Sequence, residues 1–145
     1  METSKSRFAY ALLAVVALSG LSQAAKADWV LVNANANGES YMWNPVKQYY
    51  PYAYPVTAAL FYRPIPVAGW TYSAQSMRAK SVVNCNNGAL KLLFARAYAG
   101  EYLTGASVRL SSLTLRNGQR MVPGRWYAYS RLPTAARAGI NFACE

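Results

Sequence analysis

Histidine is absent from this chain of 145 residues, and acidic residues are scarce, with 5 against 15 lysines and arginines. Without an imidazole, the chain lacks the side chain that most often serves as an acid or base near neutral pH. It has only two cysteines, and two thiolates cannot complete the four-ligand shell of a zinc ion. No glycine-rich phosphate loop or dinucleotide fingerprint occurs either. We therefore expect no metal, no cofactor and no enzymatic activity.

Two weaker catalytic arrangements stay open. A carboxylate pair for acid-base chemistry would have to be Glu39 and Glu101, each next to a predicted turn. A serine activated by a lysine would have to be Ser81 with Lys91, on adjacent predicted strands. Neither pair belongs to a recognisable motif, so we expect a binding or structural protein.

The first segment has the three parts of a secretory signal peptide. Lys5 and Arg7 precede an apolar run over residues 8–18, and Ala25-Lys26-Ala27 forms a small-x-small end. These features predict cleavage before Asp28. The alternative is a short transmembrane anchor, but the run is well short of the roughly 20 apolar residues that span a bilayer. No cysteine lies near the cleavage point, so we expect no lipoprotein anchor.

Residues 1–27 are thus expected to be a cleaved signal peptide, and residues 28–145 a single domain exported to the periplasm, the cell surface or the medium. This domain has 12 basic and 4 acidic residues, a net charge of about +8. Such a charge favours acidic partners such as glycosaminoglycans or lipopolysaccharide phosphates, whereas an exported protein rarely meets nucleic acid. The alternative is a merely soluble basic surface, because the basic residues never form a block.

The two cysteines, Cys85 and Cys144, are expected to pair, because exported proteins fold in an oxidising compartment. Closing a loop of about 60 residues would stabilise the fold by roughly 4 kcal/mol. The alternative is two unrelated thiols.

The stretch 76–85 alternates as a strand does. One face carries Met77, Ala79, Ser81, Val83 and Cys85, and the other carries Arg78, Lys80, Val82 and Asn84. Because the first face leads to Cys85, we expect it to face Cys144 and the basic face to meet solvent.

A hairpin turn at residues 86–88 predicts that the next strand covers residues 89–98. Its alternation is expected to place Leu90, Leu92, Phe94, Arg96 and Tyr98 on one face. Side chains from the two strands form a candidate basic binding patch: Arg78, Lys80, Lys91 and Arg96. The alternative is that these residues only protect the sheet from edge-to-edge aggregation.

Prolines alternate with tyrosines over residues 48–55, which favours an exposed extended loop or edge. The three tyrosines Tyr50, Tyr52 and Tyr54 join the candidate patch as a contact surface. The alternative is a hydrophobic lid over one end of the sheet.

Further strands are predicted at residues 29–32, 40–43 and 56–63, the last ended by Pro64-Ile65-Pro66. Extended pieces are expected at 108–115, with a bulge at 111–112, and at 121–122 and 126–129. The tail changes period, because Leu132, Ala136, Ile140 and Cys144 recur every four residues. This stripe predicts a short C-terminal helix, in which Gly139 costs roughly 1 kcal/mol.

The central stretch also resembles a known family. The resemblance is carried by Ser76, Met77, Arg78, Val82-Val83, Asn84-Cys85 and Asn87, with Trp29, Trp126 and Ala143-Cys144. These residues resemble the surface-adhesin protein E family of small exported bacterial domains. The resemblance implies an antiparallel sheet of about six strands, a C-terminal helix joined by a disulfide to the concave face, and often a homodimer.

The fold class we predict is therefore α+β, with a single antiparallel sheet and a C-terminal helix linked to one face. The predicted function is that of a non-catalytic exported binding protein. The resemblance implies adhesion to host extracellular-matrix or serum proteins, and the charge adds acidic polysaccharide as a ligand. The alternative is a periplasmic inhibitor or envelope accessory protein of the same fold without a host ligand.

Overall fold

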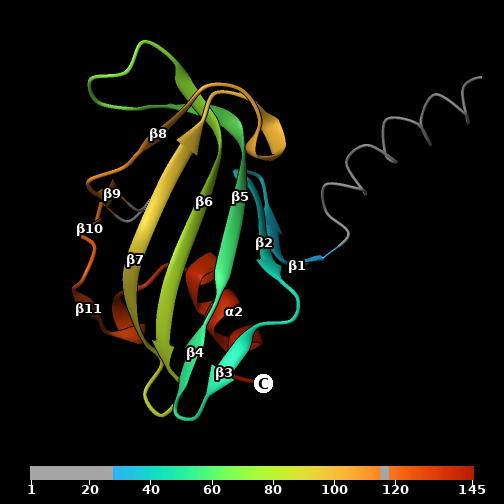
Figure 1. Ribbon diagram of the computed structural model, residues 1–145, viewed down its shortest axis with the longest axis vertical. Coiled ribbons are helices and arrows are strands. Elements are labelled where there is room, and N and C mark those ends of the chain that lie inside the picture. The colour runs from blue at the N-terminus through green and yellow to red at the C-terminus, as the bar shows by residue number, and fades with distance from the viewer. Residues whose placement is uncertain (1–27, 115–117) are drawn as a thin grey trace, which may run out of the picture.

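The computed structural model describes residues 28–114 and 118–145, so the predicted signal peptide, residues 1–27, lies outside the described residues. Figure 1 shows a long, twisted sheet with a helix behind it. The elements are β1 (Trp29–Asn35), β2 (Gly38–Trp43), β3 (Lys47–Tyr49), β4 (Tyr52–Tyr54), β5 (Val56–Pro66), β6 (Ser73–Asn84), β7 (Ala89–Tyr98), η1 (Glu101–Leu103), β8 (Ser107–Arg109), β9 (Leu113–Thr114), β10 (Arg120–Met121), β11 (Trp126–Tyr127), η2 (Tyr129–Arg131) and α2 (Thr134–Ala143).

The main sheet has nine strands, so the prediction of about six is wrong in number, whereas its antiparallel arrangement is confirmed. β4 and β5 both pair with β6, and their respective neighbours are β3 and β2. On the far side, β8 and β11 pair with different parts of β7. Proline cannot donate a hydrogen bond to the ladder, and two prolines interrupt neighbouring segments of extended chain. Pro45 lies between β2 and β3, and Pro55 lies between β4 and β5. Nine strands therefore fill six adjacent positions, while β9 and β10 form a separate pair.

Proline did not end β5 where the sequence suggested. The strand continues to Pro66, and after a register shift Ile65 and Pro66 pair with Ala74 and Ser73 of β6. Proline is tolerated at such irregularities, where a missing backbone donor does not break a regular ladder. The predicted extended piece at 108–115 is likewise divided into β8 and β9, and its last residue lies outside the described residues.

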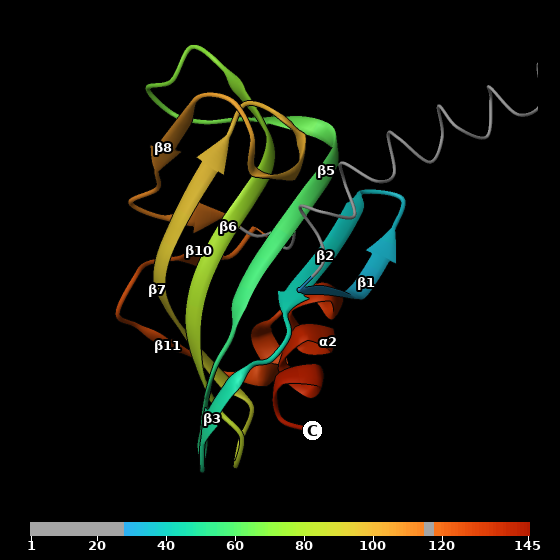
Figure 2. The ribbon, with the colours of Figure 1, turned by 45° about the vertical axis from the view of Figure 1, so that its right-hand side comes forward.

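The face of β6 that carries Met77, Ala79, Ser81 and Val83 lies against the core; we call it the inner face of the sheet. The buried core cluster is Met42, Ala53, Ala79, Val83, Leu92, Ala95, Met121, Tyr127, Leu132, Ile140 and Ala143. α2 covers the lower part of this face and contacts β1 and β2 (Figure 2). The predicted helical stripe is confirmed, because Leu132 and Ile140 are only 2% and 3% exposed.

Gly139 has a packing role within α2. A Cβ atom at this position would lie 3.0 Å from the Cε of Met42 in β2, tighter than ordinary van der Waals contact. The helix thus approaches the sheet closely through a residue that is unfavourable for helix formation. The sequence shows the cost of this glycine, and the packed structure shows that a side chain here would have to displace the end of Met42.

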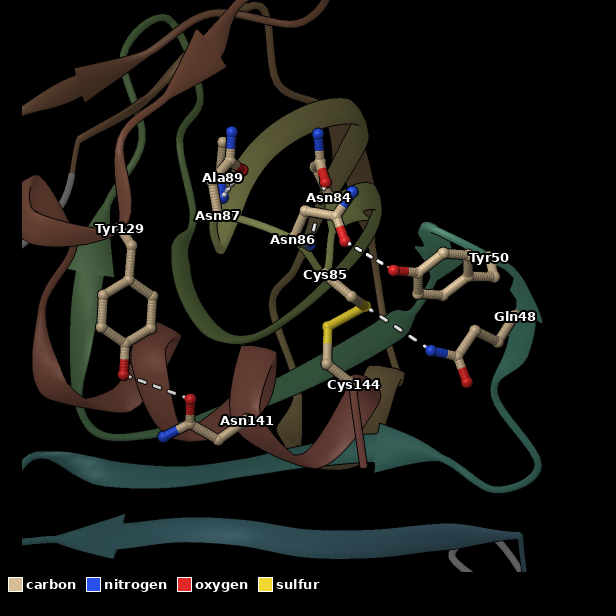
Figure 3. The surroundings of a disulfide bond; sticks show 10 residues. All are labelled: Gln48, Tyr50, Asn84, Cys85, Asn86, Asn87, Ala89, Tyr129, Asn141 and Cys144. Atoms are coloured by element: carbon tan, nitrogen blue, oxygen red, sulfur yellow. Dashed lines mark hydrogen bonds between the residues drawn. A yellow bond between two sulfur atoms is a disulfide. The ribbon is translucent and has the colours of Figure 1, made fainter.

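The predicted disulfide is present and joins the end of β6 to the end of α2 (Figure 3). Cys85 and Cys144 are 59 residues apart in sequence, and their Cα atoms are 5.5 Å apart. Gln48 lies beside the bond, with its Nε2 3.6 Å from the Cys85 Sγ. The disulfide therefore joins two distant segments at one end of the sheet, and a residue of β3 lies next to it.

The predicted faces of β7 are wrong beyond Leu92. Lys80 pairs with Phe94 and Ser81 pairs with Leu92, so Leu93 has no partner and forms a bulge. A bulge adds one residue to one strand, which exchanges the two faces for everything that follows. Ala95 and Ala97 consequently lie in the core at 1% exposure, and Phe94 and Arg96 point to the opposite side.

Candidate functional site

The face of the sheet opposite α2 carries Arg78, Lys80 and Val82 of β6; we call it the outer face. It is turned toward the viewer in Figure 1, where the strands cross in front of α2. Direct partners in antiparallel strands project to the same face, so the register identifies its other members. Among the described residues, η1 lies across the upper end of this face, where it contacts β5, β6 and β7.

Three arginines lie in register across three adjacent strands. Arg78 of β6 is directly opposite Arg96 of β7, which is directly opposite Arg109 of β8. Adjacent strands are about 4.8 Å apart, so the three Cα atoms span roughly 10 Å. We call this set the arginine row.

The arginine row is not neutralised within the described residues. None of its three members forms an ion pair with a carboxylate, and Arg96 donates instead to the hydroxyl of Ser107 at 2.9 Å. The Nε of Arg78 is buried without a hydrogen-bond partner. Like charges directly opposite each other are unfavourable in a sheet, so the row adds electrostatic repulsion to the folded state. Such a cost is typical of a site that binds an opposite charge.

The ring of Phe94 contacts two arginines of the row. The guanidinium carbons of Arg109 and Arg96 lie 5.0 Å and 5.9 Å from the centre of its ring. Contacts of this kind attract a cation to the ring face without cancelling its charge. Lys80, which is exposed, is the direct partner of Phe94 and adds a fourth positive charge to the cluster.

Below the arginine row, four exposed aromatic side chains form a second cluster, which we call the aromatic platform: Tyr49, Tyr52, Tyr54 and Trp126. Tyr49 and Tyr52 are direct partners, as are Trp126 and Lys91, so both pairs lie on the outer face. The ring centres of Tyr52 and Trp126 are 6.4 Å apart, and those of Tyr49 and Tyr54 are 5.9 Å apart. The Nζ of Lys91 lies 4.9 Å from the centre of the Trp126 ring. Aromatic rings and positive charge are therefore combined here as well.

The outer face brings together six of the seven predicted patch residues: Arg78, Lys80, Lys91, Arg96, Tyr52 and Tyr54. Tyr50 lies apart, at the turn after β3, where its hydroxyl donates to the Oδ1 of Asn86 at 2.9 Å (Figure 3). Residues 47–49 and 52–54 are strands of the sheet: β3 is its edge, and β4 lies between β3 and β6, so this stretch is not a lid.

Sequence reasoning missed Tyr49, Phe94, Arg109 and Trp126. The run of three apolar residues from Leu92 to Phe94 breaks strict alternation and was the available signal for the bulge. Arg109 sits in a strand of three residues, whose pairing no local pattern reveals.

Ser76 has a structural role on the outer face. It is 1% exposed, and its hydroxyl donates to the backbone carbonyl of Gly100 at 2.6 Å and accepts from the backbone N–H of Leu103 at 2.9 Å. These bonds attach the loop that contains η1 to β6, near the upper end of the outer face. The loop thus closes the upper border of the site, above the arginine row.

The fold is similar to that of protein E from Haemophilus influenzae. A structure of that protein in its second crystal form superposes with a TM-score of 0.57 at 12% identity, over 81% of this chain and 87% of the other. Another structure of Haemophilus influenzae protein E gives 0.54 at 12% identity, over 81% and 83%. Protein E from a non-typeable strain also gives 0.54 at 12% identity, over 81% and 75%.

No protein-family model matches the sequence. No curated protein matches it either. The likeness to protein E therefore concerns the fold, and the fold resemblance inferred from the central stretch is confirmed at that level.

The disulfide between Cys85 and Cys144 is typical of an exported protein, because reducing compartments rarely maintain such bonds. Within residues 28–114 and 118–145, no helix is long and apolar enough to cross a membrane. The predicted homodimer stays a prediction.

Proposed function

We propose that this chain is a non-catalytic, exported binding protein that uses the outer face of its sheet to hold an anionic macromolecule. The observation that carries the proposal is the arginine row. Three like charges in direct register are unfavourable for folding, and no carboxylate neutralises them among the described residues. A negatively charged ligand would remove this repulsion and gain charge-assisted hydrogen bonds.

The fold of protein E adds support for a binding role. The resemblance seen in the sequence implies adhesion to host extracellular-matrix or serum proteins, and acidic segments of such proteins or acidic glycans would complement the outer face. The surplus of positive charge over the whole domain would also speed the encounter with any such ligand, in a way that falls with ionic strength.

Binding to immobilised heparin and to polyglutamate, measured over a series of salt concentrations, tests the proposal. Lys80→Gln combined with Arg109→Gln removes two exposed charges from the site and is expected to weaken binding to both probes roughly tenfold. The control is Arg63→Gln with Arg120→Gln, which removes two exposed charges elsewhere. Equal losses in both double variants, or no binding by the unmodified protein, would reject the outer face as the site.

Location is tested separately by fractionating cells that express the full chain. Surface labelling of intact cells is the outcome expected for a host-binding protein. Recovery only from osmotic-shock fluid would favour the periplasmic accessory role, with an anionic ligand inside the envelope.

A further inference from the structure

We infer that the anionic macromolecule is a linear acidic polysaccharide, held at two subsites: the arginine row for its charged groups and the aromatic platform for the apolar faces of its sugar rings. This inference rests on the proposed function and names the ligand class. It is carried by the position of the two clusters on one continuous face of the sheet.

The two subsites lie along the same strands. On β6, Arg78 belongs to the arginine row, and Val82 is the direct partner of Lys91, which in turn is paired with Trp126. Four residues of extended chain separate the arginine row from the Lys91–Trp126 pair of the platform, a distance of roughly 13 Å. A single phosphate or sulfate cannot bridge this distance, whereas an extended polymer with repeated charges can.

The platform adds a requirement that charge alone does not explain. Its four residues are 39–64% exposed, so together they present a large aromatic surface to solvent. Pyranose rings carry C–H groups on their faces, which pack against aromatic rings, and their hydroxyls can bond to the tyrosine hydroxyls. Lys91, above Trp126, would place a positive charge beside a stacked sugar. The carboxylates of an acidic protein segment offer no such flat, C–H-rich partner.

Nucleic acid is the other polymer that combines charge with stacking rings. Bases stack on parallel aromatic surfaces in succession. The rings here are inclined, by 69° between Tyr49 and Tyr54 and by 37° between Tyr52 and Trp126. This geometry suits separate contacts with individual sugars better than a stack of bases, and the disulfide argues for a compartment without nucleic acid.

A second copy of this chain fits the face less well. Two copies joined through their outer faces would bury two surfaces that each carry an excess of positive charge, from the arginine row, Lys80 and Lys91, and would therefore add repulsion. The charge of the face is thus complementary to an acidic ligand and not to itself.

The test measures binding of the purified chain to three probes by isothermal titration: a heparin-derived oligosaccharide, polyglutamate of matched charge and a single-stranded DNA oligonucleotide. Two double variants divide the site. Tyr52→Ala with Trp126→Ala removes the platform, and Lys80→Gln with Arg109→Gln removes exposed charge. Tyr72→Ala is the control, because Tyr72 is an exposed aromatic residue in the loop before β6.

We expect the platform variant to lose roughly tenfold in affinity for the oligosaccharide and to keep its affinity for polyglutamate, while the charge variant weakens on both probes. Unchanged oligosaccharide binding in a platform variant with a normal thermal melt would overturn the polysaccharide inference and leave the proposed function standing. Tighter, platform-dependent binding of the DNA would replace it with nucleic-acid binding. If the unmodified protein binds no probe, both the inference and the proposed function fail.

Discussion

The two faces of the sheet are built from the same strands and follow opposite rules. On the inner face, Ala79 and Ala95 are small and buried, as is Gly139 in the helix that covers this face, so helix and strands approach closely. On the outer face, three arginines stand side by side and large aromatic rings are exposed. The inner face follows the requirements of stability, whereas the outer face departs from them. That contrast locates the candidate site without any bound ligand.

The largest effect on stability is expected from removing the disulfide, which lies on the inner side of the sheet. Cys144→Ser is expected to lower the free energy of unfolding by about 4 kcal/mol, because the open chain regains the entropy of a loop of about 60 residues. Urea denaturation under non-reducing conditions measures this change. Reduced wild-type protein is the control and should behave as the variant does. An unchanged urea midpoint would show that the disulfide does not stabilise the fold.

The next largest effect is expected from the helix itself. Ile140→Ala removes a side chain that is 3% exposed in the core, and the cavity should cost about 3 kcal/mol. Asn141→Ala, at an exposed position of the same helix, is the matched control and should cost far less. A small loss at Ile140, measured by thermal unfolding, would mean that α2 is not part of the cooperative core.

Ser76→Ala tests a buried polar residue on the outer face, where the contrast between the two faces does not hold. The change leaves the backbone N–H of Leu103 and the carbonyl of Gly100 without a partner, and should cost about 2 kcal/mol. Amide hydrogen exchange should quicken in residues 100–105 and stay the same in α2. Slow exchange in the η1 loop of the variant would contradict its attachment through Ser76.

The smallest effect has the opposite sign. Arg96→Gln removes the central charge of the arginine row and is expected to stabilise the fold by about 0.5 kcal/mol at low salt, since it relieves repulsion on both sides. The gain should shrink as salt screens the remaining charges. Arg120→Gln, outside the row, provides the baseline. If Arg96→Gln instead destabilises the fold, and salt does not change the effect, then Arg96 stabilises the sheet by packing and charge repulsion in the row is negligible.

The sequence predicts local structure here better than it predicts faces. The alternation of β6, the hairpin at residues 86–88 and the helical stripe of the tail are each read from consecutive residues, and each is confirmed. The number of strands and the faces of β7 were wrong because both depend on pairing between segments. One unpaired residue, Leu93, exchanges every later side chain between core and solvent.

The same limit applies to the site. Arg78, Lys80, Lys91 and Arg96 could be proposed as a patch because they lie on two strands joined by a recognisable turn. Arg109 reaches the patch from a three-residue strand and Trp126 from a two-residue strand, both late in the chain and without a periodic signal of their own. Their positions follow from the ladder with β7 and from nothing local.

By itself, then, the sequence determined the basic charge, the two cysteines and the alternating stretch from Ser76 to Cys85, because these depend only on which residues are present and in what order. The tertiary structure alone decided that Arg78, Arg96 and Arg109 stand in one row and that Tyr52 lies beside Trp126. The physical reason is that a sheet joins distant segments through backbone hydrogen bonds, which every residue can accept and every residue but proline can donate. Register, and with it the outer face, is fixed by the packing of the whole core.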